Sequence, residues 1–134
     1  MSLLLDANVW LAAADRDDAF HDAARRLVHS ERIEHAALDL TVYEVGNVAT
    51  RRWRDPERAR RLCLLVLTAC RERLVRIGAD LAEEAVRIAD GEQITVYDAA
   101  YVAAARRDGH VLISGDLLDL VERGLALPPD AAEA

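Results

Sequence analysis

Short runs of leucine and β-branched residues recur along this chain and alternate with longer segments of helical character. The runs occupy residues 3–5, 36–38, 74–77, 111–113 and, more weakly, 125–127. Strands that alternate with helices are typical of a parallel sheet covered by helices on both faces. We therefore predict an α/β fold with a central parallel sheet of four to five strands flanked by helices on both faces.

The helices are predicted from the spacing of apolar residues and from the residues that start and end helices. Pro56 stands in the favoured first position of one helix, and Gly91 and Gly109 follow two others. The expected helices span residues 9–14, 19–31, 41–54, 56–71, 81–89, 96–107 and 117–123. Since the 134 residues contain no linker and no shift in composition, we predict one domain over residues 1–127 and a short flexible C-terminal tail over 128–134.

The charge balance narrows the classes of function. A net charge of −7 argues against a protein that grips nucleic acid with its whole surface. All 17 basic residues are arginine, which excludes mechanisms that need a lysine, such as a Walker A loop or a Schiff base. The sequence contains neither a segment suited to crossing a membrane nor a signal-peptide pattern, so we expect a cytoplasmic protein.

Four acidic residues lie at or near places where an element gives way to a helix. Each could simply cap the helix that follows. Thr41 with Glu44, and Thr95 with Asp98, have the spacing of a capping box. Asp6 and Asp116 could each be an N-cap. The four acids are Asp6, Glu44, Asp98 and Asp116.

The same four acids also suggest a shared metal site. In a parallel sheet the carboxyl ends of the strands lie along one edge, where ligands bind. Carboxylates that converge there would repel one another and raise each other's pKa unless a cation compensated them. Because no Cys or His lies close to them in sequence, the expected cation is hard, Mg²⁺ or Mn²⁺.

The segments LLLDANVWLA, TVYEVGNVA, TVYDAAYVAAA and LISGDLLDL resemble, in order and spacing, the signature segments of the PIN-domain ribonucleases. At this length the chain is similar to a VapC-type toxin of a type II toxin–antitoxin system. The resemblance implies a single PIN-like nuclease domain whose acidic quartet binds Mg²⁺ or Mn²⁺. By motif, this quartet is Asp6, Glu44, Asp98 and Asp116.

The resemblance also assigns supporting residues. Asn8 matches a polar residue that supports the first aspartate, and Ser114 stands where the family has a hydroxyl residue, more often threonine. Asp119 falls where some members have a further acid, although it could equally be a solvated charge on a helix. We expect Asp6 and Asp98 to be the principal ligands, Asp116 to complete the site, and Glu44 to bind through water or position the nucleophile.

The implied function is that of a metal-dependent endoribonuclease that cleaves RNA phosphodiester bonds by metal-activated water. The products should carry a 5′ phosphate and a 3′ hydroxyl. The resemblance implies three partners: an RNA substrate, a small cognate antitoxin and a second copy of the chain in a homodimer. Residues 61–70 are apolar nearly all round, so this helix is either central in the core or covered by a partner.

Residues 51–61 hold six arginines against two acids, with a tryptophan among them. Arginines can contact phosphates while an aromatic ring stacks on an unpaired base. This pattern makes Arg51, Arg52, Trp53 and Arg54 candidates for RNA binding. The alternative is a solvated junction between two helices with Trp53 packed into the core.

Other functions remain open at this stage. One is a stand-alone PIN-type nuclease in RNA processing, and another is a non-catalytic RNA-binding or regulatory domain whose acids are only caps. A receiver-type phosphoacceptor domain would need a lysine, which the chain lacks. A phosphatase of the haloacid dehalogenase type would need a second aspartate where Asn8 stands.

Overall fold

The computed structural model describes residues 2–132, and its centre is a parallel sheet of four strands in the order β3-β2-β1-β4. Leu3 of β1 pairs with His35 of β2 on one side and with Val111 of β4 on the other. A single parallel bridge joins Leu127 to Ile113, in place of a fifth strand. The strands are β1 (Ser2–Leu5), β2 (Glu34–Leu38), β3 (Leu74–Val75) and β4 (Val111–Ile113).

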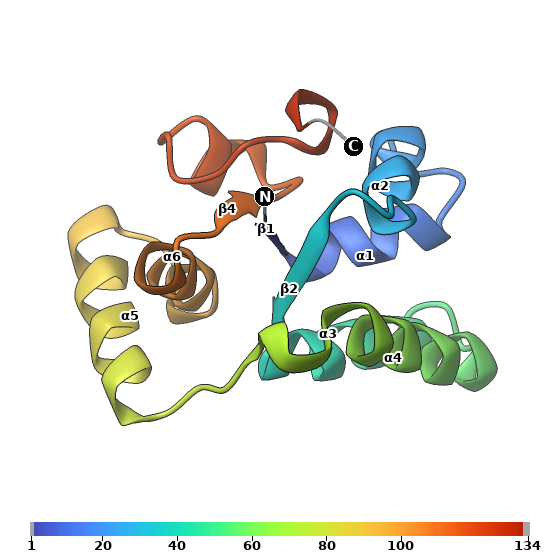
Figure 1. Ribbon diagram of the computed structural model, residues 1–134, viewed down its shortest axis with the longest axis horizontal. Coiled ribbons are helices and arrows are strands. Elements are labelled where there is room, and N and C mark those ends of the chain that lie inside the picture. The colour runs from blue at the N-terminus through green and yellow to red at the C-terminus, as the bar shows by residue number, and fades with distance from the viewer. Residues whose placement is uncertain (1, 133–134) are drawn as a thin grey trace.

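Helices cover both faces of this sheet. Figure 1 shows α5 and α6 on one side and α1 to α4 on the other. Leu3 and Leu5 belong to one hydrophobic cluster and Leu4 to a second, because successive side chains of a strand point to opposite faces. The predicted α/β fold is therefore confirmed. The helices are α1 (Ala7–Ala14), α2 (His21–Val28), α3 (Asp39–Arg51), α4 (Pro56–Cys70), α5 (Ala79–Glu92) and α6 (Val96–Asp108).

Several helix ends differ from the prediction. Helix α3 begins at Asp39, two residues before the expected start, and Thr41 is its third residue. The Thr41 hydroxyl oxygen accepts a 3.2 Å hydrogen bond from the backbone N–H of Leu38, so Thr41 reaches back to cap the helix start. Helix α5 runs through Gly91 and ends at Gln93, which adopts the left-handed conformation. Gly109 ends α6 as predicted, with a φ of 72°.

The C-terminal part of the chain is more ordered than expected. Leu117–Val121 forms a π-helix, and Pro129–Ala131 forms a short 3-10 helix (η3) within the segment predicted to be a flexible tail. Pro129 is buried, and Ala132 packs against the hydrophobic cluster that contains Leu3. The prediction of a flexible tail is therefore wrong for residues 129–132, while 133 and 134 lie outside the described residues.

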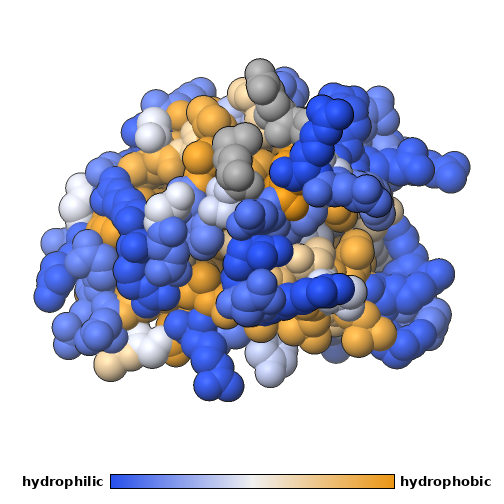
Figure 2. All heavy atoms as spheres, in the orientation of Figure 1, coloured by the Kyte–Doolittle hydropathy of each residue, from blue (hydrophilic) through white to orange (hydrophobic). Residues whose placement is uncertain are grey.

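Charged and polar side chains cover most of the face shown in Figure 2, with apolar atoms between them. Helix α4 contributes both kinds of surface. Leu62 and Val66 are buried, whereas Leu64 and Leu67 are 48% and 41% exposed. This helix is therefore half in the core, and two of its leucines are open to solvent. None of the helices within residues 2–132 has the length and apolar character that crossing a membrane requires.

Candidate active site

Asp6 stands at the carboxyl end of the central strand and is buried, with 6% of its surface exposed. It occupies the N-cap position of α1, but its side chain makes no capping hydrogen bond. Its Oδ2 accepts instead a 2.8 Å hydrogen bond from the Ser114 hydroxyl and a longer one, 3.4 Å, from the Asn8 side-chain amide. The capping interpretation is therefore wrong for Asp6, whose carboxylate is held from the end of the neighbouring strand β4.

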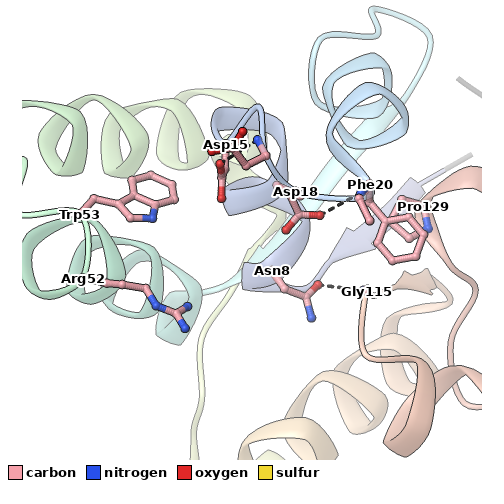
Figure 3. A pocket seen from close by; sticks show the side chains of 11 residues that line it. Asn8, Asp15, Asp18, Phe20, Arg52, Trp53, Gly115 and Pro129 are labelled. Carbon is pink, nitrogen blue, oxygen red and sulfur yellow. Dashed lines mark hydrogen bonds between the residues drawn. The ribbon is translucent and has the colours of Figure 1, made fainter.

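Ser114 and Asn8 connect the two strand ends. The buried Ser114 oxygen also accepts hydrogen bonds from the Asp116 backbone N–H at 3.0 Å and from the Asn8 amide at 3.3 Å. The Asn8 oxygen accepts the Gly115 N–H at 2.9 Å (Figure 3). Both residues that the family resemblance marked as supporting thus contact Asp6 and fix the loop after β4 against it.

Glu44 projects from α3 and is half-buried. Its Oε1 accepts a 2.7 Å hydrogen bond from the hydroxyl of Tyr101, which is only 1% exposed. The Tyr101 oxygen lies 2.7 Å from the Thr41 hydroxyl; since the tyrosine proton goes to Glu44, Thr41 donates to it. Glu44 therefore does not cap α3, which Thr41 caps, and the capping-box prediction for this pair is wrong.

Tyr101 is a member of the site that the sequence did not single out. It lies three residues after Asp98 on α6, close to one helical turn, so the two residues share a face. In an alanine-rich buried helix a tyrosine is easily taken for a core residue. The signal available in the sequence is this spacing, because a buried tyrosine hydroxyl needs a polar partner.

Asp98, Asp116 and Asp119 form the tightest group of acids, with one carboxylate oxygen from each lying within 4.8 Å of the others. Asp98 is in the first turn of α6, where its backbone N–H is capped by Thr95. Asp116 does cap, as its Oδ1 accepts the Asp119 N–H at 3.0 Å. The structure thus brings Asp119 to the site, whereas the sequence left open whether it was a solvated charge.

Neighbouring carboxylates raise the pKa values of three acids in the quartet, Asp6, Glu44 and Asp98. Burial, together with the charges of Glu44 and Asp98, raises the pKa of Asp6 to about 7, against the hydrogen bond from Ser114. Burial and the charge of Asp98 raise the pKa of Glu44, and the bond from Tyr101 opposes this. The pKa of Asp98 is raised by burial and by its neighbours Asp116 and Asp119. The cluster therefore has two halves, Asp6 with Glu44 and Asp116 with Asp119, and Asp98 is the acid that links them.

This cluster fits a hard divalent cation. In the described part of the chain, no arginine forms an ion pair with any acid of the quartet, and the nearest pairing is Arg123 with Asp119 at 3.9 Å. Burial and the neighbouring negative charges raise the pKa values of Asp6, Glu44 and Asp98, so a bound cation would stabilise their ionised forms. Carboxylate oxygens are the ligands that Mg²⁺ and Mn²⁺ prefer.

The candidate RNA-binding residues lie at the end of α3 and in the turn that follows it. Arg51, Arg52 and Arg54 are exposed, and Trp53 is partly buried against the core with the Arg58 guanidinium 4.2 Å from its ring centre. Arg52 and Trp53 line a cavity of about 560 Å³, whose far side is formed by Asn8 and Gly115 (Figure 3). Arg51 and Arg54 are not among the residues that line it.

Fold and site together define a parallel α/β domain with an acidic centre at the strand ends. The model of the PIN domain matches residues 3–117. The chain therefore belongs to the PIN domain family, as its four motifs predicted.

Solved structures of similar proteins agree with this family. A toxin–antitoxin complex from Klebsiella pneumoniae contains a chain of 20% identity and TM-score 0.71, with 95% of this chain and 97% of that one covered. PAE2754 from Pyrobaculum aerophilum has 28% identity and TM-score 0.70, with 98% and 85% covered. VapC20 of Mycobacterium tuberculosis, a sarcin-ricin loop cleaving toxin, has 24% identity and TM-score 0.64, with 85% and 91% covered. A search of curated proteins finds no match.

Proposed function

We propose that this chain is a metal-dependent endoribonuclease that acts as the toxin of a toxin–antitoxin pair. The observation that carries the proposal is the uncompensated acidic cluster at the carboxyl edge of the sheet. Asp6 follows β1 and Asp116 follows β4, while Glu44 comes from the second turn of α3 and Asp98 from the first turn of α6. A family whose members include RNA-cleaving toxins, and a fold shared with toxin–antitoxin complexes, support the same function.

The residues suited to hold Mg²⁺ or Mn²⁺ are Asp98 and Asp116, joined by Asp6 and, at the rim, Asp119. When bound, such a cation lowers the pKa of a water and neutralises charge on the phosphate. Glu44 is the proposed general base, which accepts a proton from the attacking water. Its Oε1 is held by Tyr101 and its raised pKa brings it closer to the range of a general base, so its other oxygen can orient the attacking water and accept a proton from it.

Asp6 acts differently, because it is buried and fixed. Ser114 and Asn8 hold its Oδ2, so the carboxylate cannot turn away when the substrate enters. Because the Asp6 carboxylate already holds its position, it does not have to reorient during the reaction. The proposed partners are an RNA substrate, a small antitoxin and a second copy of the chain, and the proposed compartment is the cytoplasm.

The decisive experiment compares the wild-type protein with Asp98→Asn on RNA in the presence of Mn²⁺. We expect the substitution to reduce cleavage at least about 100-fold, because Asp98 is the acid that both halves of the cluster share. Its thermal unfolding should stay close to that of the wild type. Asp90→Asn on the exposed surface of α5 is the matched control and should cleave normally. A fully active Asp98→Asn protein would refute the proposal.

Two further measurements separate this function from a non-catalytic acidic domain. Calorimetry with Mn²⁺ should detect a site in the wild type that disappears in Asp6→Ala. RNA ends produced by the protein should carry a 5′ phosphate and a 3′ hydroxyl. Metal binding without cleavage of any RNA would favour the non-catalytic alternative.

A further inference from the structure

The largest cavity described lies beside the acidic cluster, and we infer that it is a subsite for one nucleoside of the RNA, the one next to the scissile phosphate, with guanine the preferred base. The inference rests on the proposed ribonuclease function and specifies how its substrate is held. The cavity measures about 560 Å³, within the range of about 300–1,000 Å³ for small-molecule sites. That volume is ample for a base and its ribose.

Asn8 connects the cavity to the acidic cluster. This side chain lines the cavity, and its amide donates toward Asp6 while its oxygen accepts from Gly115, another lining residue. A phosphodiester bound at the acids would therefore place an adjacent nucleoside at the cavity mouth. Figure 3 shows Asn8 and Gly115 joined by their hydrogen bond below Asp18 and Phe20.

Two of the chain's few aromatic residues face each other across this space. Trp10 and Tyr101 are fully buried in the core. Trp53 and Phe20 are only partly buried and line the cavity, Trp53 from the turn after α3 and Phe20 from the segment before α2 (Figure 3). The Arg58 guanidinium, 4.2 Å from the indole centre, holds Trp53 in place. Aromatic side chains of this kind are the usual stacking surfaces for unpaired RNA bases.

The polar groups of the cavity match a base and its phosphate. Asp15 and Asp18 each engage one carboxylate oxygen with a backbone N–H of their own loop, at 3.0 and 2.9 Å. Each retains a second oxygen that can accept from a ligand. Guanine has two adjacent N–H donors on its Watson–Crick edge, more than uracil offers, and Arg52 on the opposite wall can meet a phosphate.

The test uses the full-length protein labelled with ¹⁵N, in which the two tryptophan indole N–H groups report separately on the core and on the cavity. Guanosine 5′-monophosphate should shift the Trp53 signal and leave the Trp10 signal in place. It should bind about tenfold more tightly than uridine 5′-monophosphate, the ratio expected for one additional hydrogen bond. Mononucleotides contain no phosphodiester bond for the enzyme to cleave, so binding is observed without turnover.

Asp18→Asn is the informative variant, because the amide oxygen can still accept from the Phe20 N–H and preserve the loop. It should remove most of the preference for guanosine, whereas Asp22→Asn, on the exposed face of α2, should retain it. In RNA cleavage, Trp53→Ala should raise KM far more than it lowers kcat, and Trp53→Phe should restore KM. If Trp53 had a purely structural role, Trp53→Ala would instead lower the thermal stability and would not raise KM far more than it lowers kcat.

The inference would be overturned if guanosine 5′-monophosphate left the Trp53 signal unmoved, or if all nucleotides bound equally in wild type and Asp18→Asn. A shift caused by N-acetylarginine methylamide but not by nucleotides would assign the cavity to a cationic protein partner instead. RNA cleavage without nucleotide binding would refute the subsite alone. Nucleotide binding by a protein that cleaves no RNA would refute the proposed function itself.

Discussion

The hydroxyl of Tyr101 donates a 2.7 Å hydrogen bond to Oε1 of Glu44, linking α6 to α3 beside the acidic cluster. Glu44 is the one acid of the quartet whose carboxylate is held by a phenol. The bond opposes the effect of burial, which raises the pKa of Glu44, and so helps to keep this carboxylate ionised. Tyr101 is therefore expected to position Glu44 and tune it, without touching the substrate.

Tyr101→Phe tests this role. Removing the hydrogen bond should raise the pKa of Glu44 further, so the acid limb of the kcat profile should move to higher pH. Activity should fall several-fold at the acidic end and recover as the pH rises, because Glu44 is needed in its ionised form. Tyr97→Phe, a change at an exposed tyrosine of the same helix, is the control. An acid limb that stays in place would show that Tyr101 only packs.

Asp6 should make the metal-free protein less stable as the pH rises. Its pKa is about 7 in the folded protein, against 3.8 for an ordinary aspartate. Because the folded state holds the proton more tightly than the unfolded chain, the stability that this proton contributes is complete below pH 3.8 and is lost as the pH rises through 7. The loss should be a few kcal/mol, in the range of about 2–4.

Asp6→Asn should flatten this dependence, and we expect the variant to be the more stable protein at about pH 8 in EDTA. Urea unfolding at about pH 5 and pH 8 measures the effect. Added Mg²⁺ or Mn²⁺ should stabilise the wild type at the higher pH, since it neutralises the charge, and should stabilise the variant less. Equal pH slopes for the two proteins would contradict the assignment.

The sequence was sufficient to predict the sheet and the helices because each depends on local pattern. Leu3 to Leu5 form a short apolar run that ends at Asp6, and the parallel strands bring such endings to one edge. The roles of Thr41 and Tyr101 could not be predicted, because the hydroxyl of Tyr101 meets residues about 60 positions away. That meeting depends on how the sheet positions α6 relative to α3, which no local pattern encodes.

The cavity was not predicted either. Asp15 and Asp18 accept hydrogen bonds from the backbone of their own loop and face Trp53 across open space, an arrangement that the charged sequence of residues 15–18 does not reveal. The order of residues 129–132 was missed because the burial of Pro129 depends on its contact with α2. Loops take their shape from the elements that they contact, so they carry little signal of their own.

Asp119 should contribute to metal binding. Its carboxylate lies within 4.8 Å of those of Asp98 and Asp116, although 51% of its side chain is exposed and Arg123 competes for it at 3.9 Å. Asp119→Asn should weaken Mn²⁺ binding about tenfold, less than the loss expected for Asp98→Asn. Calorimetry measures both, with the exposed Glu122→Gln as control. An unchanged affinity would identify Asp119 as a solvated helix charge.

Two helices approach each other closely at Gly46. A Cβ atom built there would lie 3.1 Å from the Cys63 sulfur on α4, which is tighter than most contacts of real Cβ atoms. Alanine is favoured over glycine inside a helix by about 1 kcal/mol, so the clash and the helix preference oppose each other. Gly46→Ala should therefore stabilise the protein clearly in a Cys63→Ala background and less, or not at all, in the wild type. Urea unfolding of the four proteins measures the coupling, and additive free energies of unfolding would contradict the contact.

The arginines after α3 should attract RNA to an acidic protein. Arg51, Arg52 and Arg54 are exposed, and each phosphate contact with a single strand adds about 0.7 to the slope of log affinity against log salt. Replacing all three with glutamine should weaken binding of a labelled single-stranded RNA and reduce that slope by up to about 2. Anisotropy in EDTA keeps the RNA intact. The same change at Arg25 and Arg26, on the exposed face of α2, should leave the slope close to that of the wild type. If the triple variant retains the wild-type slope, the segment is a solvated junction between α3 and α4 that takes no part in binding.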